Sequence, residues 1–279
     1  MPGIKLLLFQ TFLIHLISLR FNSIHAFFFD MDGVLSVGKQ SPRYVGGREV
    51  VSRIKSIQKQ AFVLTNDSTH TRKEICENLQ NLGFNFSVED VLTSSYLTAL
   101  YLNQHFKRNV SFLLLGERGL LQELVTAGHR PTDHRPEVVV VGLDRQLNYA
   151  KLDLALRLVR EGATLVGSYG GALYMGDCGP ALSAGPIIKA LEYGAHRRAV
   201  MIGKPSTRMF KLALRLARVN PSQAVMVGDQ IDTDLLGAKR TGVHTILVLT
   251  GTETRDTIRK SNLKPELVIG NVDELLEYL

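Results

Sequence analysis

From Ile24 onward the chain alternates short apolar runs with longer segments of helical periodicity, and this alternation restricts it to a small set of folds. The runs are apolar at successive positions, which is typical of strands buried on both faces of a parallel sheet. The sequence therefore predicts an α/β fold with a doubly wound parallel sheet. The predicted strands are residues 26–29, 61–64, 110–115, 138–141, 164–166, 199–202, 224–227 and 245–249, and the predicted helices are residues 47–60, 71–82, 94–105, 117–127, 149–161, 186–193, 207–217, 233–241 and 272–278.

The composition argues against several other classes of protein. Of the 279 residues, 45% are hydrophobic and 21% are charged, which predicts neither a disordered chain nor a coiled coil. The 33 basic residues outnumber the 26 acidic ones, but they are scattered, so we expect no nucleic-acid partner. The two cysteines, Cys76 and Cys178, lie far apart, and this spacing predicts neither a disulfide framework nor a zinc site and favours the cytoplasm.

The N-terminus carries an apolar run, residues 6–19, that follows Lys5 and has the character of a signal-peptide core. The run is shorter than the roughly 20 residues that a membrane-spanning helix needs. Cleavage after Ala26 would place Ile24 where a signal peptidase prefers a small residue. We therefore interpret residues 1–23 as an extension or a start codon placed too far upstream and expect no stable membrane association, with cleavage or anchoring as the alternatives.

Polar residues stand at the ends of the predicted strands. In open α/β sheets, ligands bind at the carboxyl ends of the strands, so these residues are expected to gather at one site. Any one of them alone is an ordinary turn or strand end. They are Asp30 and Asp32 in FFFDMDGVL, Thr65 and Asn66 in VLTND, Lys204 in MIGKPS, and Asp229 and Asp234 in VMVGDQIDTD.

Together these residues have the chemistry of phosphoryl transfer. Neighbouring carboxylates with water and phosphate oxygens are the ligands that Mg²⁺ prefers, and the cation would offset their mutual repulsion. A carboxylate can attack phosphorus, and a second one nearby can protonate the leaving oxygen and later activate water. Lys204 and the hydroxyl of Thr65 would stabilise the phosphoryl oxygens.

The four ordered motifs FFFDMDGVL, VLTNDST, GKPS and VGDQIDTD resemble those of haloacid dehalogenase (HAD) superfamily phosphatases of the NagD-like subfamily IIA. The resemblance runs from about residue 24 to residue 279. It implies that Asp30 is the nucleophile and a metal ligand, and that Asp32 is the general acid/base with its backbone carbonyl on the metal. Asp229 matches the side-chain metal ligand, and Asp234 matches a position that holds metal-bound water or the lysine.

The resemblance also assigns the phosphate-binding positions. Thr65 and Asn66 match them, and Lys204 matches the lysine that steadies the nucleophile and the phosphate. Asp67 stands where the family often has a second Asn, so contacts to phosphate are expected to differ there. For Asp232 we prefer the simpler interpretation that it is the N-cap of the next helix.

About 140 residues separate Thr65 from Lys204, far more than a crossover needs, so an inserted domain is expected. The resemblance implies a Rossmann-like core, residues 24–105 and 199–279, and an α/β cap of the C2 type, residues 106–198. Such a cap would close over the site and exclude water. Two caps could pair into a homodimer.

The glycine-rich connection 167–185 departs from the family, since Tyr169, Gly170 and Gly171 stand where an Asn-Pro-Asp-like stretch is common. Tyr169, Tyr174 and Met175 could line an apolar pocket above the phosphate, but Leu173 and Met175 could equally pack inside the cap. The histidines are scattered without metal-ligand spacing and are interpreted as structural or surface residues.

The expected function is a Mg²⁺-dependent phosphatase acting on a small phosphorylated metabolite through an aspartyl-phosphate on Asp30. Pyridoxal phosphate, glycerol phosphate and nucleotide monophosphates are alternative substrates. The alternative from another class is a binding or regulatory protein that keeps the fold but hardly turns over.

Overall fold

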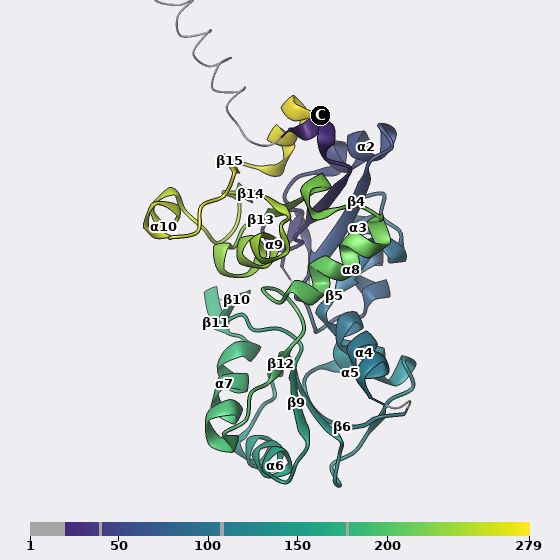
Figure 1. Cartoon of the computed structure of the whole chain (residues 1–279), viewed down its shortest axis with the longest axis vertical. Coiled ribbons are helices and arrows are strands. Elements are labelled where there is room, and N and C mark those ends of the chain that lie inside the picture. The colour runs from purple at the N-terminus through teal and green to yellow at the C-terminus, as the bar shows by residue number, and fades with distance from the viewer. Residues whose placement is uncertain (1–19, 39–40, 107–108, 177–178) are drawn as a thin grey trace, which may run out of the picture.

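The computed structural model describes residues 20–38, 41–106, 109–176 and 179–279. Most of the predicted N-terminal extension, residues 1–19, lies outside this description. The described chain forms two parallel sheets that lie one beyond the other along the long axis of the molecule (Figure 1). The predicted α/β fold with a doubly wound core and a second α/β layer is confirmed. Among the described helices, none combines the length and the apolar character needed to cross a membrane.

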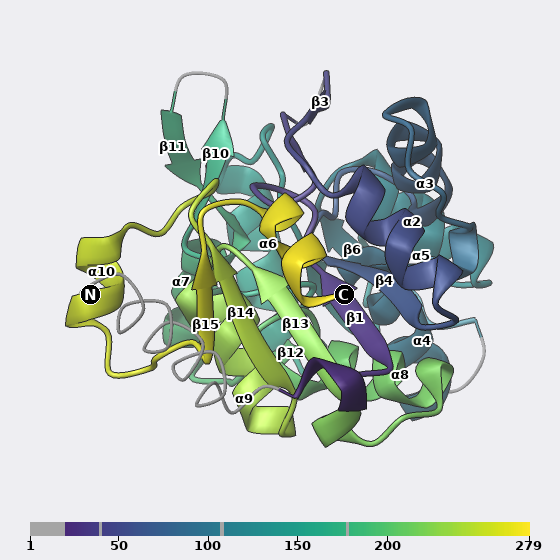
Figure 2. The same ribbon diagram turned by 90° about the horizontal axis from the view of Figure 1, so that it is seen from above.

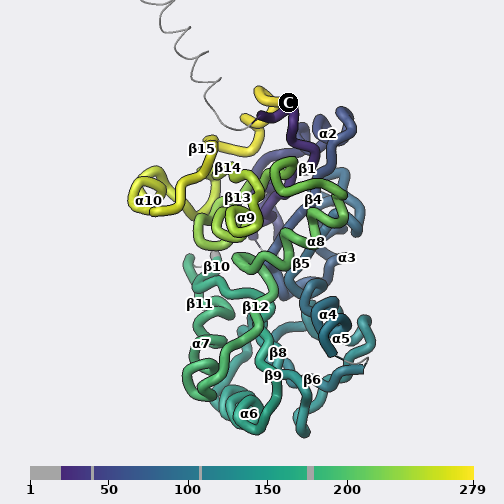
Figure 3. Tube along the Cα trace, viewed as in Figure 1, coloured from purple at the N-terminus to yellow at the C-terminus, as the bar shows by residue number. Residues whose placement is uncertain are grey.

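The first sheet forms the core, and all of its neighbouring strands are parallel. Because β1 lies in the middle of this sheet, the chain builds outward from it in both directions (Figure 3). The short strands β5 and β15 were not predicted. In spatial order the strands are β15 (Leu267–Ile269), β14 (His244–Val248), β13 (Ala224–Gly228), β1 (Ala26–Phe29), β4 (Gln60–Thr65) and β5 (Val91–Thr93).

Helices cover both faces of the core sheet, and the side chains of β1 show the alternation. Phe27 and Phe29 point into the cluster beneath α2 and α3, whereas Phe28 points into the cluster beneath α4 and α8. All three rings are fully buried. The first face carries α2 (Arg48–Ser56), α3 (Arg72–Asn81) and the 3₁₀ segment η5 (Val272–Tyr278), and the second face carries α4 (Ser94–His105), α8 (Thr207–Ala217) and α9 (Leu236–Thr241).

The second sheet forms the cap and is also parallel, in the order β12 (Val200–Met201), β9 (Thr164–Gly167), β8 (Val138–Val141), β6 (Ser111–Leu115) and β7 (Arg130–Pro131). Its helices are α5 (Arg118–Thr126), α6 (Tyr149–Arg160) and α7 (Ala184–Ala195). The sequence predicted residues 199–202 as the first strand of the second core segment. In the structure β12 pairs with β9 of the cap sheet, so the predicted domain boundary between residues 198 and 199 falls before the last cap strand in the sequence.

The glycine-rich connection is a hairpin rather than a loop. Strands β10 (Leu173–Gly176) and β11 (Gly179–Leu182) pair antiparallel and project from the body of the molecule (Figure 2). Leu173 and Leu182 face each other across the pair, and each is more than half exposed. The remaining short elements are β2 (Ser36–Val37), β3 (Arg43–Tyr44), α10 (Arg255–Lys260), η1 (Phe21–Ser23), η2 (Val88–Asp90), η3 (Pro221–Gln223) and η4 (Ile231–Leu235).

The cap is fastened to the core through the first turn of α5. The backbone N–H groups of Gly119 and Leu120 donate to the carbonyl oxygens of Thr69 and Ser68 in the core, each at 3.1 Å. First-turn N–H groups have no partner within their own helix, so the core loop supplies what the helix lacks. The N–H of Leu143 also donates to Ser68 Oγ at 3.2 Å. These hydrogen bonds, which we call the α5 seam, hold one side of the cap against the core.

We predict that Gly119→Ala destabilises the protein by about 1–3 kcal/mol, because a Cβ there would collide with the backbone of Thr69 and His70. Denaturant unfolding followed by circular dichroism measures the effect. Gly171→Ala is the matched control, since its Cβ would make only ordinary contacts, the nearest at 3.6 Å. A midpoint for Gly119→Ala equal to that of the wild type would show that the α5 seam is not close-packed.

Candidate active site

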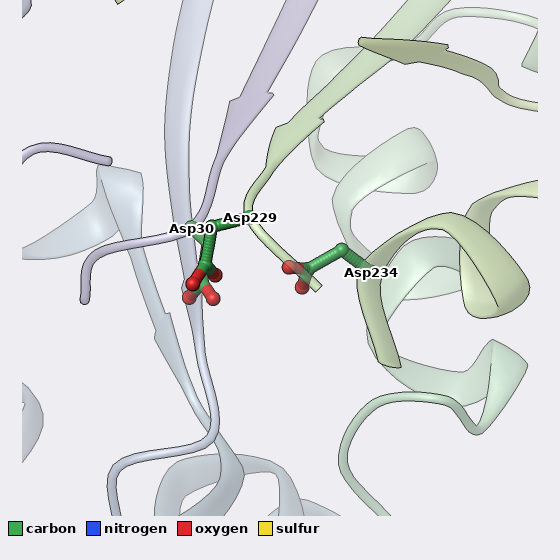
Figure 4. Close-up of side chains that lie close together, drawn as sticks. All are labelled: Asp30, Asp229 and Asp234. Atoms are coloured by element: carbon green, nitrogen blue, oxygen red, sulfur yellow. The ribbon is translucent and has the colours of Figure 1, made fainter. Parts of the chain in front are cut away.

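The site lies at the point where the strand order of the core sheet reverses. Strand β1 pairs with β4 on one side and with β13 on the other, and the chain continues away from β1 in both directions. Asp30 follows β1 and Asp229 follows β13, so both carboxylates lie at the carboxyl ends of these two parallel strands (Figure 4). Crevices at such switch points are where open α/β sheets bind ligands.

Lys204 joins two of the carboxylates. Its Nζ lies 2.8 Å from Asp30 Oδ1 and 2.7 Å from Asp234 Oδ1, and the side chain is 1% exposed. The Asn66 side chain holds the lysine backbone from the other side, because its Oδ1 accepts from Lys204 N at 2.9 Å and its Nδ2 donates to Lys204 O at 3.1 Å. The amide of Asn66 therefore positions the backbone of Lys204, and the contact with phosphate that the resemblance implies stays a prediction.

Asp234 reaches the lysine from a turn of unusual geometry. The segment η4 is a π-helical turn between β13 and α9, and turns of this kind are frequent at functional sites. Asp234 is fully buried, and its Oδ2 accepts from Gln230 N at 3.1 Å. Asp232 lies inside the same turn, so the interpretation of Asp232 as the N-cap of the next helix is wrong.

Asp229 has one satisfied oxygen and one that is not. Oδ2 accepts from Thr252 N at 2.8 Å, whereas Oδ1 is buried and has no hydrogen-bond partner within the described part of the chain. Gly33, at φ +79°, leaves room for this carboxylate, since a Cβ there would lie 2.8 Å from Asp229 Oδ2. A Cβ on Gly251 would also collide with it. A buried carboxylate oxygen left open in this way suits a cation.

Burial and mutual repulsion disfavour the charged forms of these acids. Burial raises the pKa of Asp30 to about 7, with the charge of Asp234 adding to the effect and Lys204 opposing it. Burial, followed by the charge of Asp30, raises the pKa of Asp229 to about 7 as well. Burial alone would lower the pKa of Lys204, but the charges of Asp234 and Asp30 outweigh it and raise that pKa.

The residues present fit a divalent cation. Ligand oxygens of Asp30, Asp229 and Asp234 all lie within 4.8 Å of one another. Three carboxylates and one ammonium group leave an excess of two negative charges when all are ionised. Mg²⁺ is held by one or two carboxylates together with waters and phosphate oxygens, and this set supplies the carboxylates. Because Asp234 is already engaged by Lys204 and Gln230, Asp30 and Asp229 are the better candidates for direct contact.

The loop after β4 is organised by its own side chains. Asp67 N donates to Thr65 Oγ1 at 3.0 Å, and Asp67 Oδ1 accepts from Thr69 N and from Thr69 Oγ1 at 2.6 and 2.7 Å. Asp67 Oδ2 lies 3.2 Å from His70 Nδ1. His70, interpreted from the sequence as a structural or surface residue like the other histidines, has a structural contact in this loop. An Asp followed two residues later by Thr is a usual pattern of a turn closed by the Asp side chain.

The cap residues predicted from the sequence to line a pocket differ in burial in the structure. Tyr169 is 7% exposed and packs inside the cap, and its hydroxyl accepts from Ser183 Oγ at 2.8 Å. Tyr174 is half-buried on β10. The backbone of Met175 belongs to β10, but its side chain lies outside the described atoms. Leu173 is 57% exposed, so the alternative that it packs inside the cap is wrong.

The cap also presents a cation that the sequence analysis did not single out. Arg145 Nε and Nη2 donate to the two carboxylate oxygens of Glu117, each at 2.7 Å. These hydrogen bonds raise the pKa of Arg145, to which the charges of Tyr174 and Asp67 add. Arg145 stands two residues after Leu143, whose backbone N–H donates to Ser68 Oγ in the core. The arginine therefore lies next to the hydrogen bonds that join the cap to the core.

Comparison with known proteins identifies this arrangement. Residues 27–130 match the haloacid dehalogenase-like hydrolase family, and residues 201–275 match a HAD-hydrolase-like family. Human glycerol-3-phosphate phosphatase is 31% identical, over 90% of this chain and 89% of its own length. The Arabidopsis thaliana chloroplastic phosphoglycolate phosphatase 1A is 28% identical, over 91% of this chain and 77% of its own.

Solved structures agree with the sequence relatives. A p-nitrophenyl phosphatase from Archaeoglobus fulgidus superimposes with a TM-score of 0.85 at 31% identity, covering 92% of this chain and 99% of that one. NagD from E. coli K-12 superimposes with a TM-score of 0.79 at 27% identity, covering 90% and 98%. The chain belongs to the haloacid dehalogenase-like hydrolases. Within them it is a NagD-like phosphatase of subfamily IIA, as the motifs predicted.

The raised pKa values predict how stability depends on pH when no divalent cation is present. Asp30 and Asp229 have an ordinary pKa of 3.8 and a folded pKa of about 7, so the folded state holds their protons more tightly. Their contribution to stability is fully present below 3.8 and is lost as the pH rises through about 7. In a chelator, the free energy of unfolding of the wild type should therefore fall relative to that of Asp229→Asn between about pH 4 and pH 7.

Chemical denaturation at a series of pH values measures this difference. Asp153→Asn, an exposed carboxyl on α6, is the control and should run parallel to the wild type. Saturating Mg²⁺ should remove most of the fall in the wild type and have little effect on Asp229→Asn. Parallel curves for the wild type and Asp229→Asn in chelator would contradict the electrostatic description of the site.

Proposed function

We propose that this phosphatase hydrolyses small phosphate monoesters by transferring the phosphoryl group to Asp30, with Mg²⁺ as its cofactor. The observation that carries the proposal is the buried contact of 2.8 Å between Lys204 Nζ and Asp30 Oδ1, beside the open oxygen of Asp229. A carboxylate fixed in this way is oriented for attack, and the surrounding charges are complementary to a phosphoryl group.

The side chains divide the work of the reaction. Asp30 Oδ1 already accepts from Met31 N at 2.7 Å and contacts Lys204, so Oδ2 is the oxygen that attacks phosphorus. The bond to the leaving oxygen breaks, and Asp32 donates a proton to that oxygen. Asp32 then accepts a proton from the water that attacks the acyl phosphate, which releases inorganic phosphate and restores Asp30.

The remaining residues position these groups. Asp234 and Asn66 hold Lys204 at the carboxylate, and Thr65 contributes its hydroxyl to the phosphoryl oxygens. Asp30, Asp229 and the backbone carbonyl of Asp32 would hold Mg²⁺, which neutralises charge on the phosphoryl oxygens when it is bound. The geometry of Asp67 supports a structural part for its side chain, because both oxygens serve its own loop.

The relatives support the substrate class. Their names state activity on glycerol 3-phosphate, phosphoglycolate and p-nitrophenyl phosphate, all of which are monoesters of small alcohols or phenols. We infer that this chain acts on the same class. We infer that Tyr174 on the hairpin and Arg145 of the cap select among these substrates, because the core residues are assigned to the phosphoryl group that all of them share.

We predict that the protein hydrolyses p-nitrophenyl phosphate with Mg²⁺ and loses activity in chelator, and that Asp30→Asn lowers kcat at least about 10³-fold. Release of p-nitrophenol measures the rate. Asp153→Asn, which removes an exposed carboxyl, is the control and should keep full activity. An inactive wild type in Mg²⁺ would favour the binding-protein alternative, and an active Asp30→Asn would overturn the assignment of the nucleophile.

A further inference from the structure

A groove runs between α4 and α8, the two helices that lie one above the other where the core meets the cap (Figure 1). Its volume is about 430 Å³, within the range of sites that hold small organic ligands. Leu97, Ile202 and Leu214 are among the side chains that line it, and all three are buried. The groove therefore offers an apolar floor outside the residues assigned to phosphoryl transfer.

The rim of the groove is basic. Arg208, Lys211 and Arg215 project from successive turns of α8, and no carboxylate is among the residues that line the groove. Lys211 and Arg215 are exposed and make no ion pair within the described part of the chain. Three cations beside an apolar floor, without a nearby acid, attract an anion that also carries an apolar body.

The opposite wall adds flat surfaces. Tyr101 and His105, one turn apart on α4, stack with their ring centroids 4.1 Å apart. The guanidinium of Arg208 lies 5.2 Å from the centroid of the Tyr101 ring, so the cation and the ring already approach each other across the groove. A planar ligand body entering here would contact the tyrosine ring and place its acidic group against α8.

We propose that this groove is a second ligand site, which binds a small organic anion with an aromatic or otherwise flat apolar body and a single acidic group. The site is distinct from the phosphoryl-transfer site. Ile202 on the groove floor stands two residues before Lys204, whose side chain points to Asp30. The ligand therefore lies behind the catalytic lysine and does not compete with the phosphate.

A ligand in the groove contacts both chain segments that connect the core to the cap. Helix α4 ends at His105, directly before the chain crosses into the cap, and Ile202 follows β12, where the chain returns. A ligand that contacts both restrains the movement of one sheet relative to the other. Because the restraint acts on the crossovers, it changes kcat.

The test uses 8-anilinonaphthalene-1-sulfonate, an aromatic sulfonate whose fluorescence rises on transfer to an apolar site. We expect the double variant Lys211→Glu with Arg215→Glu to weaken its binding about tenfold or more, because two attractive charges become repulsive. The control is Lys239→Glu with Arg240→Glu, which makes the same change of net charge on exposed positions of α9 and should bind the probe within about twofold of wild type. Equal binding by the two double variants would overturn the proposal.

Two further measurements separate this site from the phosphoryl-transfer site. Saturating inorganic phosphate with Mg²⁺ should leave probe binding unchanged, and displacement of the probe would place it at Asp30 and overturn the proposal. The probe should change kcat for p-nitrophenyl phosphate in the wild type but not in the Lys211→Glu, Arg215→Glu variant. A probe that binds in the groove without changing kcat would overturn the link to the crossovers. The binding measurements need no turnover, so they stand even if the proposed phosphatase chemistry fails.

Discussion

The ammonium group of Lys204, buried between Asp30 and Asp234, is the interaction on which the rest of the site depends. A charge taken out of water must be paired, and both carboxylates are themselves buried and disfavoured in their charged forms. Each partner comes from a different part of the chain: the end of β1, the return from the cap, and the π turn after β13. The fold brings these three segments together at one switch point, so a defect in any of them leaves a buried charge unpaired.

The same arrangement leaves the site incomplete without a ligand. One ammonium group cannot balance three carboxylates, and one oxygen of Asp229 has no partner in the described part of the chain. A bound cation would relieve the repulsion between these carboxylates. The cap has a different part. It is hydrogen-bonded to the core along the α5 seam and carries an exposed hairpin, and both segments that connect it to the core border the basic groove.

The sequence predicted the buried strands and the strand-end acids well, because continuous apolar runs and carboxylates after them leave few alternatives. It did not predict β5, β15 or the hairpin, since these strands are only three or four residues long and lie at sheet edges or outside the sheets. Contacts that join distant segments were also out of reach. No sequence feature around Asn66 indicates that its amide hydrogen-bonds to the backbone of Lys204, 138 residues away. Likewise, no feature around Tyr169 indicates that Ser183 donates a hydrogen bond to its hydroxyl.

Trapping the intermediate would show whether Asp30 carries the phosphoryl group during turnover. Asp32→Asn removes the group that activates water, so the acyl phosphate should accumulate during turnover of p-nitrophenyl phosphate. Acid quenching, digestion and mass spectrometry would locate it. One added phosphoryl group should appear on the peptide that contains Asp30, and it should be absent when Asp30→Asn is combined with Asp32→Asn. A phosphoryl group on another residue, or none during active turnover, would show that Asp30 is not the nucleophile.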